Sequence, residues 1–226
     1  WEPGNDPDGK RIAAAKYYVD QLKHELFERA AVVDFDDDAF LVPEYNPDGD
    51  HLSMDYAKIK SNIELANNTQ GGTNIPLAME VANTELIDYG WINHTWVVIL
   101  LTDGRNWCLP YGVPCPPLDN QMNDIDDPLI KQAIDNDITY YTVGLGDDVN
   151  TTLLANLANF TGGSYHPAAT ADELQEIYDE IHEEIVSMAG KAITVTETLT
   201  PDFDYVLGSF SVPPTSASGK TAAWDI

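Results

Sequence analysis

Residues 95–104, TWVVILLTDG, contain the longest apolar run of the chain. A short apolar run without alternating polar residues is typical of a parallel strand that is buried on both faces. The run ends at Asp103-Gly104, as a central parallel strand ends where a loop begins. The stretch therefore predicts a strand over residues 95–102 in the middle of a parallel sheet, with Asp103 at its carboxyl end.

Helical and strand-like segments alternate on either side of this strand. Apolar residues at helical spacing predict helices at residues 10–27 (after an N-cap at Asp8), 56–65, 75–87, 128–135, 151–159 and 171–188. Shorter β-type runs predict strands at residues 29–35, 39–43, 139–145 and 164–166. The alternation predicts an α/β fold: an open, mostly parallel, doubly wound (Rossmann-like) sheet with helices on both faces. Ligands of such sheets bind at the carboxyl ends of the strands.

The pattern changes after Gly190, where helical periodicity gives way to short β-type runs divided by Pro, Gly and Ser. A segment this short cannot bury a core of its own. We therefore expect residues 1–189 to form the α/β domain and residues 190–226 to begin a β domain, which is either a fragment or completed by another chain segment.

The chain has 226 residues, with 38 Asp+Glu, 11 Lys+Arg and a net charge of −27. A field of this sign repels phosphates, which excludes nucleic acid and bare anionic membranes as partners. Hydrophobic residues make up 43% of the chain, enough for a packed core. No apolar run reaches the roughly 18–20 residues that span a bilayer. The acidity is either an ordinary solvated surface or an adaptation to salt.

Cysteines and glycosylation sequons favour an extracellular or cell-surface location. Cys108 and Cys115 lie in a loop rich in Pro and Gly, where they form either a local disulfide or two reduced thiols. The Asn-x-Ser/Thr sequons, which are possible N-glycosylation sites, are Asn67, Asn93, Asn150 and Asn159.

Two loop segments carry candidate binding residues. One is Gly71-Gly72-Thr73-Asn74, directly before a predicted helix, and the other is Asp103-Gly104, directly after the apolar strand. Taken alone, Thr73 is equally well explained as a helix N-cap. Asp103 is equally well explained as part of an Asx-turn with Gly104.

The order of several motifs resembles the von Willebrand factor type A (VWA) domain family. The resemblance covers roughly residues 6–189 and rests on the stretches DPDGKRIAAAKYYVDQL, TQGGTNIPLAMEVA, VVILLTDG, ITYYTVGLGDDVN and LANLANFTGGSYHPAATADELQEIYDEI. It implies a divalent cation, usually Mg²⁺, at a metal-ion-dependent adhesion site (MIDAS) built from an Asp-x-Ser-x-Ser loop, a Thr and an Asp. By position in the motifs, Thr73 matches the Thr and Asp103 the Asp. Hydroxyl and carboxylate oxygens suit such a cation.

The chain departs from the family pattern because it contains no Asp-x-Ser-x-Ser. The resemblance implies that this loop and the first central strand lie ahead of Trp1, leaving an open slot between the strands at residues 29–35 and 95–102. Two matched ligands are too few for the near-octahedral coordination of Mg²⁺. We therefore expect this chain to bind Mg²⁺ weakly or not at all, and a full-length parent to bind it.

The C-terminal segment resembles the start of a β-sandwich repeat of prokaryotic surface proteins, on Thr196-Glu197-Thr198-Leu199-Thr200-Pro201, Gly208-Ser209-Phe210 and Trp224. The resemblance as a whole implies a metal-dependent adhesion module of a secreted or surface protein, which is not an enzyme and which binds a protein ligand through an acidic side chain. Trp107 and Tyr111 are further candidates for contact with that partner. The alternatives are a metal-free structural spacer of a surface protein and an intracellular chelatase-type assembly subunit.

Other motifs favour no competing function. The acidic runs Asp6/Asp8, 34–38 and Asp48/Asp50 do not fit the EF-hand pattern and are interpreted as solvated turns. The histidines are scattered, and no nucleophile motif accompanies them.

Overall fold

The computed structural model describes residues 6, 8–23, 26–43, 49–66, 72–105 and 125–190, with the strands at 194–198, 216–218 and 221–225. It divides into two compact units, Trp1–Asp179 and Glu180–Ile226, and each is described by itself. No helix in the described ranges combines the length and apolar character that crossing a membrane requires.

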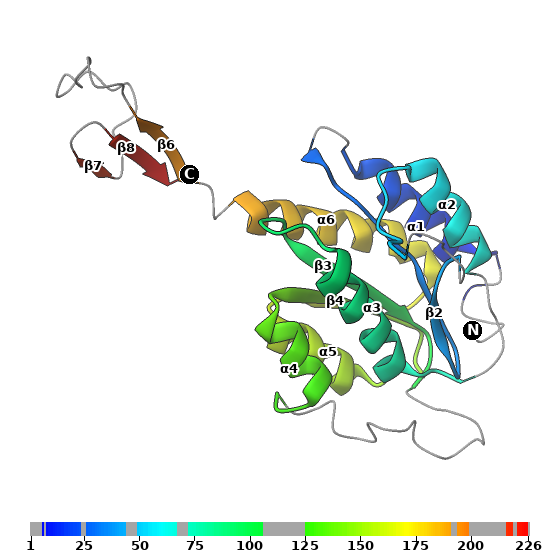
Figure 1. The fold of residues 1–226 in the computed structure, drawn as a ribbon. Helices are drawn as coiled ribbons and strands as arrows, with labels where there is room; N and C mark the ends of the chain where they lie inside the picture. The colour runs from blue at the N-terminus through cyan, green and yellow to red at the C-terminus, as the bar shows by residue number, and fades with distance from the viewer. Residues whose placement is uncertain are drawn as a thin grey trace. The chain divides into compact units, whose positions relative to one another are not determined.

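A parallel sheet forms the centre of the first unit (Figure 1). Its strands are β3 (Trp96–Thr102), β4 (Ile138–Leu145) and β5 (Tyr165–Ala168), in the order β3-β4-β5. All eight residues of β4 are buried, whereas most of β3 is only half-buried. In the described sheet β4 is therefore the central strand, and β3, which we expected in the middle, lies at an edge because it pairs on one side alone.

A separate two-stranded antiparallel sheet consists of β1 (Val33–Phe35) and β2 (Ala39–Leu41), with Val33 opposite Leu41. The prediction of a buried strand over residues 29–35 is therefore wrong in two respects. The strand begins only at Val33, and its three residues are half-buried. The strand ends at Phe35 because residues 36–38 reverse the chain: Asp36 N donates to Asp38 O at 2.8 Å, and Asp38 N donates to the Asp36 carboxylate at 2.9 Å. Before the strand, Ala30 pairs instead with Ser53 in an isolated antiparallel bridge.

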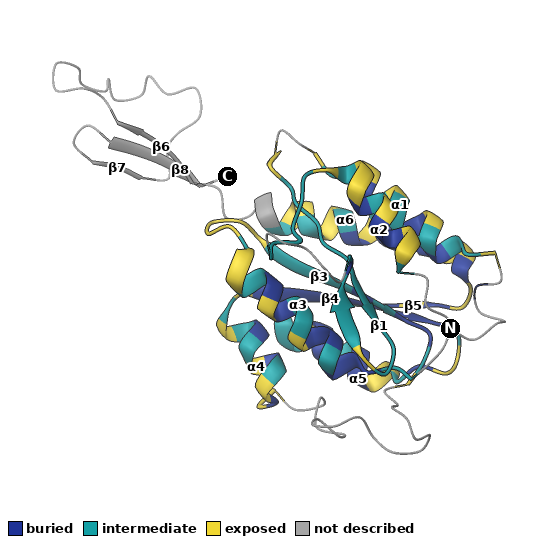
Figure 2. Cartoon of the chain, turned by 45° about the vertical axis from the view of Figure 1, so that its right-hand side comes forward, coloured by how far each residue is buried: buried dark blue, intermediate teal, exposed yellow. Residues whose placement is uncertain are grey.

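Helices cover both faces of the parallel sheet, which confirms the predicted fold class (Figure 2). The helices are α1 (Lys10–Gln21), α2 (Tyr56–Leu65), α3 (Ile75–Tyr89), α4 (Pro128–Asp135), α5 (Thr151–Thr161) and α6 (Leu174–Gly190), with a short 3₁₀ turn η2 (Ala171–Glu173) before α6. One face carries α3, α4 and α5 over an extensive apolar cluster, which includes Met79, Leu100 and Tyr140. The other face carries α1, α2 and the first turns of α6, where the Tyr18 and Tyr178 rings lie 5.7 Å apart.

The start of α1 differs from the prediction. Its N-cap is Gly9, with a left-handed backbone, and not Asp8. The capping hydrogen bonds go instead to the carboxylate of Asp6, which accepts from Lys10 N at 2.6 Å and Arg11 N at 3.2 Å. Asp6 also pairs with the Arg11 guanidinium at 2.6 Å, with 1% of its side chain exposed, so its assignment to a solvated turn is wrong. The helix ends at Gln21 rather than at residue 27, because Leu22 has an extended backbone.

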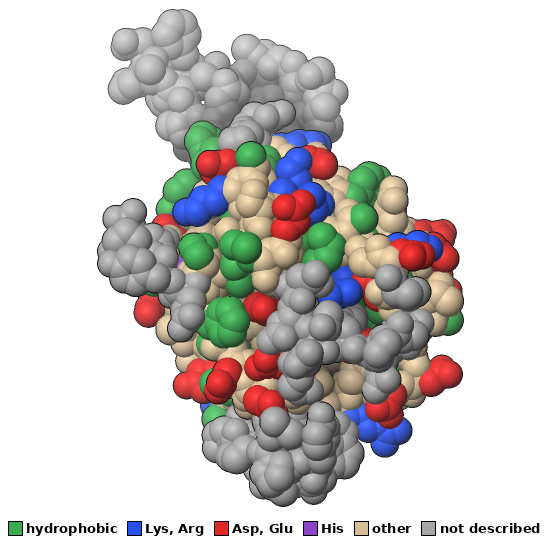
Figure 3. Space-filling model, turned by 90° about the vertical axis from the view of Figure 1, so that its right-hand side faces the viewer, with side chains coloured by type: hydrophobic (Ala, Val, Ile, Leu, Met, Phe, Trp, Pro, Cys, Tyr) green, Lys and Arg blue, Asp and Glu red, His purple; other side chains and the backbone are tan. Residues whose placement is uncertain are grey.

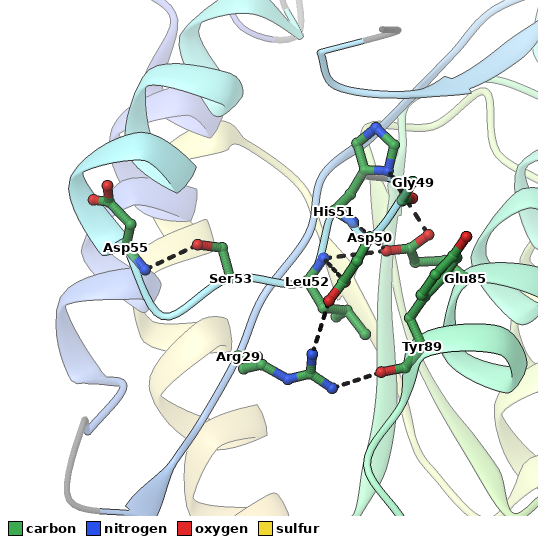
Figure 4. A network of polar contacts seen from close by, with 9 residues as sticks. All are labelled: Arg29, Gly49, Asp50, His51, Leu52, Ser53, Asp55, Glu85 and Tyr89. Carbon is green, nitrogen blue, oxygen red and sulfur yellow. Dashed lines mark hydrogen bonds and ion pairs between the residues drawn. The ribbon is translucent and has the colours of Figure 1, made fainter. Parts of the chain in front are cut away.

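A buried carboxylate on α3 holds the segment that precedes α2 (Figure 4). Glu85 Oε1 accepts hydrogen bonds from His51 N at 2.6 Å and Leu52 N at 3.1 Å. Leu52 N also donates to the side chain of Asp50 at 2.8 Å, and Asp50 in turn pairs with Arg29 at 3.3 Å. Asp50 is therefore part of a structural network and not of a purely solvated turn.

The second unit contains an antiparallel sheet in the order β6-β8-β7. Its strands are β6 (Thr194–Thr198), β7 (Ser216–Ser218) and β8 (Thr221–Asp225), with Val195 opposite Trp224. That these strands begin a β-sandwich repeat stays a prediction.

Candidate metal-binding site

Asp103 follows β3 directly at the carboxyl edge of the parallel sheet and is 7% exposed. The turn after the strand is tied by its last residue: Gly104 N donates to Thr102 Oγ1 at 3.3 Å, and this hydroxyl donates to Gly104 O at 3.2 Å. A hydroxyl that serves both groups of Gly104 fixes the direction in which the chain leaves the sheet. Asp103 is thus held at the strand end by a turn that its neighbour Thr102 closes.

Thr73 lies directly before α3 but does not cap it. The N-cap is Asn74, whose side-chain oxygen accepts from Leu77 N at 3.1 Å, and Pro76 occupies the first turn. The alternative explanation of Thr73 as an N-cap is therefore wrong. The capping preference of Asn over Thr accounts for the shift of one residue.

The structure brings the two loops together. An ideal Cβ on Gly104 would lie 2.8 Å from Thr73 Oγ1, closer than real Cβ atoms approach a neighbour. Only glycine therefore allows the loop after β3 to come this close to the Thr73 hydroxyl. Two residues 30 positions apart in the sequence, Thr73 and Asp103, consequently reach the same place on the sheet edge.

Asn74 also ties this site to the acidic turn after β1. Its backbone N–H donates to Asp36 O at 2.7 Å, and its side-chain amide donates to Asp37 O at 3.1 Å. Nearby on β1, partial burial and then the Asp36 carboxylate raise the pKa of Asp34 above its ordinary value. The residues around Thr73 are thus fixed by hydrogen bonds and lie in a region that disfavours further negative charge.

On the other side of β3, Arg105 connects the site loop to the loop after β4. Its Nε donates to the Asp148 carboxylate at 2.9 Å, and both side chains are more than half exposed. An exposed pair of this kind contributes little to stability. The Arg105 side chain does place a positive charge two positions after Asp103 in the sequence, where most neighbouring charges are negative.

The donor atoms at the site fit a hard divalent cation in kind but not in number. Thr73 and Asp103 offer a hydroxyl and a carboxylate, the oxygen ligands that such ions prefer. Within the described residues, no three His, Cys, Asp or Glu side chains gather closely enough to hold a metal ion. Acidic side chains are instead spread over the face shown in Figure 3. Among these four residue types, the described residues therefore offer no complete ligand set at the site.

The remaining candidate residues fall into two groups. Gly72 is described directly before Thr73, whereas Gly71, Trp107, Tyr111, Cys108, Cys115 and Asn67 lie outside the described residues. Among the sequons, Asn93 has an exposed side chain and a positive φ of 69°. Asn150 is the N-cap of α5 and accepts from Leu153 N at 3.1 Å, while Asn159 lies inside that helix.

The chain belongs to the von Willebrand factor type A domain family, whose model matches residues 10–180. The match spans both loops of the candidate site and every helix and strand from β1 to β5. Among curated proteins, none matches the chain significantly.

Several solved structures share the fold. A von Willebrand factor type A protein from Catenulispora acidiphila is 21% identical with a TM-score of 0.59, over 84% of this chain and 41% of that one. An aerotolerance-related membrane protein from Bacteroides fragilis is 15% identical with a TM-score of 0.56, over 80% and 88%. Proximal thread matrix protein 1 from the mussel byssus, described with a zinc-occupied MIDAS motif, is 19% identical with a TM-score of 0.55, over 81% and 41%.

At identities this low, the likeness shows the fold alone. The chain spans about two fifths of the length of the first and third of these structures.

Proposed function

We propose that this chain is a metal-dependent protein-binding module of a secreted or cell-surface protein and has no catalytic activity of its own. One observation carries the proposal: the Thr73 hydroxyl lies against Gly104, the residue that follows the buried Asp103, at the carboxyl edge of a VWA sheet. The zinc-occupied MIDAS motif of the mussel byssus protein supports a cation at such a site.

Thr73 and Asp103 would hold the cation through one oxygen each. Bound there, the ion supplies positive charge and an open coordination position to an acidic side chain of the partner. The surrounding residues position the two ligands: Asn74 fixes Thr73 by capping α3 and bonding the acidic turn, and Gly104 lets the two loops meet. Because the chain has a net charge of −27, an acidic partner would otherwise be repelled.

Calorimetric titration with Mg²⁺ and Zn²⁺ tests the proposal. We expect weak binding or none by this chain, and tighter binding by a longer form that carries an Asp-x-Ser-x-Ser loop. In that longer form, Asp103→Asn and Thr73→Val should each abolish the tight binding. Asp172→Asn is the matched control, because its exposed carboxylate lies in η2 and pairs with Lys10.

Tight binding that survives Asp103→Asn would show that the cation lies elsewhere. A longer form that carries the Asp-x-Ser-x-Ser loop and binds no cation would favour the alternative, a metal-free structural spacer.

A further inference from the structure

The turn between α3 and β3 carries one of the Asn-x-Thr sequons, Asn93-His94-Thr95. All three residues are exposed, and Asn93 has a positive φ of 69°. One backbone hydrogen bond closes the turn, from His94 N to Trp91 O at 3.3 Å. The sequon lies between the end of α3 and the start of the β3 ladder. It can therefore be drawn away from the surface without unwinding a helix or separating two strands.

Attachment of a glycan makes two demands on a sequon. The Asn carboxamide must reach the donor, an oligosaccharide linked to a lipid diphosphate, and the Thr hydroxyl two positions later must be available to the transferring enzyme. A bond forms between Asn Nδ2 and C1 of the first sugar, and the bond from C1 to the phosphate oxygen breaks. The lipid diphosphate leaves with the electron pair of the broken bond, and Nδ2 loses one proton to a base of the enzyme.

The sequon of Asn159 fails the second demand. Its hydroxyl belongs to Thr161, which donates to Leu157 O at 2.9 Å and accepts from Tyr140 N at 3.0 Å. Releasing this hydroxyl takes an acceptor from a β4 backbone N–H and unwinds the last turn of α5, where Leu157 and Ala158 are fully buried. A segment that opens only by losing buried apolar contacts opens rarely.

The sequon of Asn150 is held at the other end of α5. The side-chain oxygen of Asn150 accepts from Leu153 N at 3.1 Å, and its backbone oxygen accepts from Leu154 N at 3.1 Å. Drawing Asn150 into an enzyme removes the N-cap and the first turn of the helix. It also uncovers Leu153 and Leu154, which are 4% and 0% exposed, so this opening is rare as well.

The described sequons thus differ in what must be broken to present an acceptor, and the least is broken at Asn93. We propose that Asn93 is the N-glycosylation site of the folded chain and that Asn150 and Asn159 are not modified. The inference rests on the extracellular or cell-surface location in the proposed function, because exported chains meet the lipid-linked donor, and it needs no cation. Asn67 lies outside the described residues and takes no part in the comparison.

A glycan at Asn93 leaves the candidate metal-binding site open. Asn93 precedes the amino end of β3 and Asp103 follows its carboxyl end, so the seven residues of the strand separate them by about 23 Å. Trp91 and Ile92, directly before Asn93, are large apolar residues that are 41% and 84% exposed. A hydrated glycan on the next residue shields this apolar surface from unrelated proteins.

The test uses the whole folded chain, a purified oligosaccharyltransferase that requires only Asn-x-Ser/Thr, and a lipid-diphosphate-linked oligosaccharide. Glycopeptides are quantified by mass spectrometry after proteolysis. The occupancy of Asn93 should exceed that of Asn150 and of Asn159 by at least about tenfold. Synthetic peptides centred on each of the three Asn residues are the control. All three peptides should be modified at similar rates, because a peptide has no fold to open.

Substitutions in the turn test whether the enzyme recognises this sequon. Thr95→Ala removes the hydroxyl and should abolish the modification of Asn93, whereas Thr95→Ser should retain it. Because Thr95 is exposed, both variants should keep the urea midpoint of the parent chain. Asp103→Asn, at the candidate metal-binding site, should be glycosylated like the parent.

The inference is overturned if Asn150 or Asn159 of the folded chain is modified as readily as Asn93. It is equally overturned if Asn93 stays unmodified in the chain, or if Thr95→Ala is still modified there. The purified system does not depend on where the chain resides or on a cation at Asp103. A failure here therefore leaves the proposed function standing, and a failure of cation binding leaves this inference standing.

Discussion

Glu85 is the best place to test whether the described polar network contributes to stability. Its side chain is 4% exposed, and it accepts hydrogen bonds from the backbone N–H groups of His51 and Leu52. Its second carboxylate oxygen lies 3.8 Å from His51 Nδ1. The perturbation is Glu85→Ala, compared with Glu85→Gln and with Glu80→Ala, an exposed residue of the same helix.

The magnitude follows from counting which donors lose their acceptor. Leu52 N donates to both Asp50 and Glu85 in the described network. Glu85→Ala therefore removes one of its two acceptors and leaves the hydrogen bond to Asp50. His51 N loses the carboxylate, and an unsatisfied buried donor costs about 1–3 kcal/mol. With the lost packing and charge-assisted interaction, we expect Glu85→Ala to lower the free energy of unfolding by about 2–4 kcal/mol. Glu85→Gln keeps an acceptor oxygen and should cost about 1 kcal/mol.

Urea denaturation followed by tryptophan fluorescence measures these differences, because Trp91 and Trp96 lie just beyond the C-terminal end of α3. The unfolding midpoint should shift without a change in the slope m, and Glu80→Ala should stay within about 0.5 kcal/mol of the parent. If Glu85→Ala matches Glu80→Ala, the network does not stabilise the fold. If Glu85→Gln is as damaging as Glu85→Ala, charge and not the acceptor oxygen is what matters.

Three further substitutions test other contacts. Asp34→Asn should stabilise the chain at pH 7 and have no effect near pH 3. Because the pKa of Asp34 is raised in the folded state, protonated Asp34 favours folding below about pH 4, and this stability is lost as the pH rises through the folded-state pKa. An equal gain in urea midpoint at both pH values would contradict this. Asn74→Ala removes the cap of α3 and the hydrogen bond to Asp37 O and should cost about 1–2 kcal/mol by the same assay, whereas Asn74→Ser, which can still cap and adds no charge, should cost less. Tyr140→Phe removes the hydroxyl that donates to the side-chain oxygen of Asn83 at 2.6 Å, and the free energy of unfolding should fall by about 1–2 kcal/mol. A decrease below about 0.5 kcal/mol would mean that this buried hydrogen bond does not stabilise the fold.

Local sequence signals predicted some elements to the residue. α2 and α4 begin and end where expected because each follows an Asp that caps it, Asp55 and Asp127, and because Pro128 fixes the first turn of α4. The apolar run that became β3 was also placed within one residue. Its position at an edge could not be read from its composition, because apolar character shows that a strand is suited to burial and not that a partner is present.

The parts that sequence could not predict depend on contacts between distant segments. Thr73 and Asp103 were singled out by motif order, but their approach depends on Gly104 and on the path of α3. Asp6 and Glu85 were missed for a different reason. In a chain with 38 acidic residues, no local pattern distinguishes a carboxylate that is buried against backbone N–H groups from one that is solvated.

The excess of negative charge affects how a partner reaches the candidate metal-binding site. At the carboxyl edge, partial burial and then the Asp36 carboxylate raise the pKa of Asp34, so further negative charge is disfavoured there, and in the proposed function the cation offsets the repulsion of an acidic partner. The repulsion between acidic surfaces weakens as salt shortens its range, so the cation that the proposed function places at this site matters most at low ionic strength.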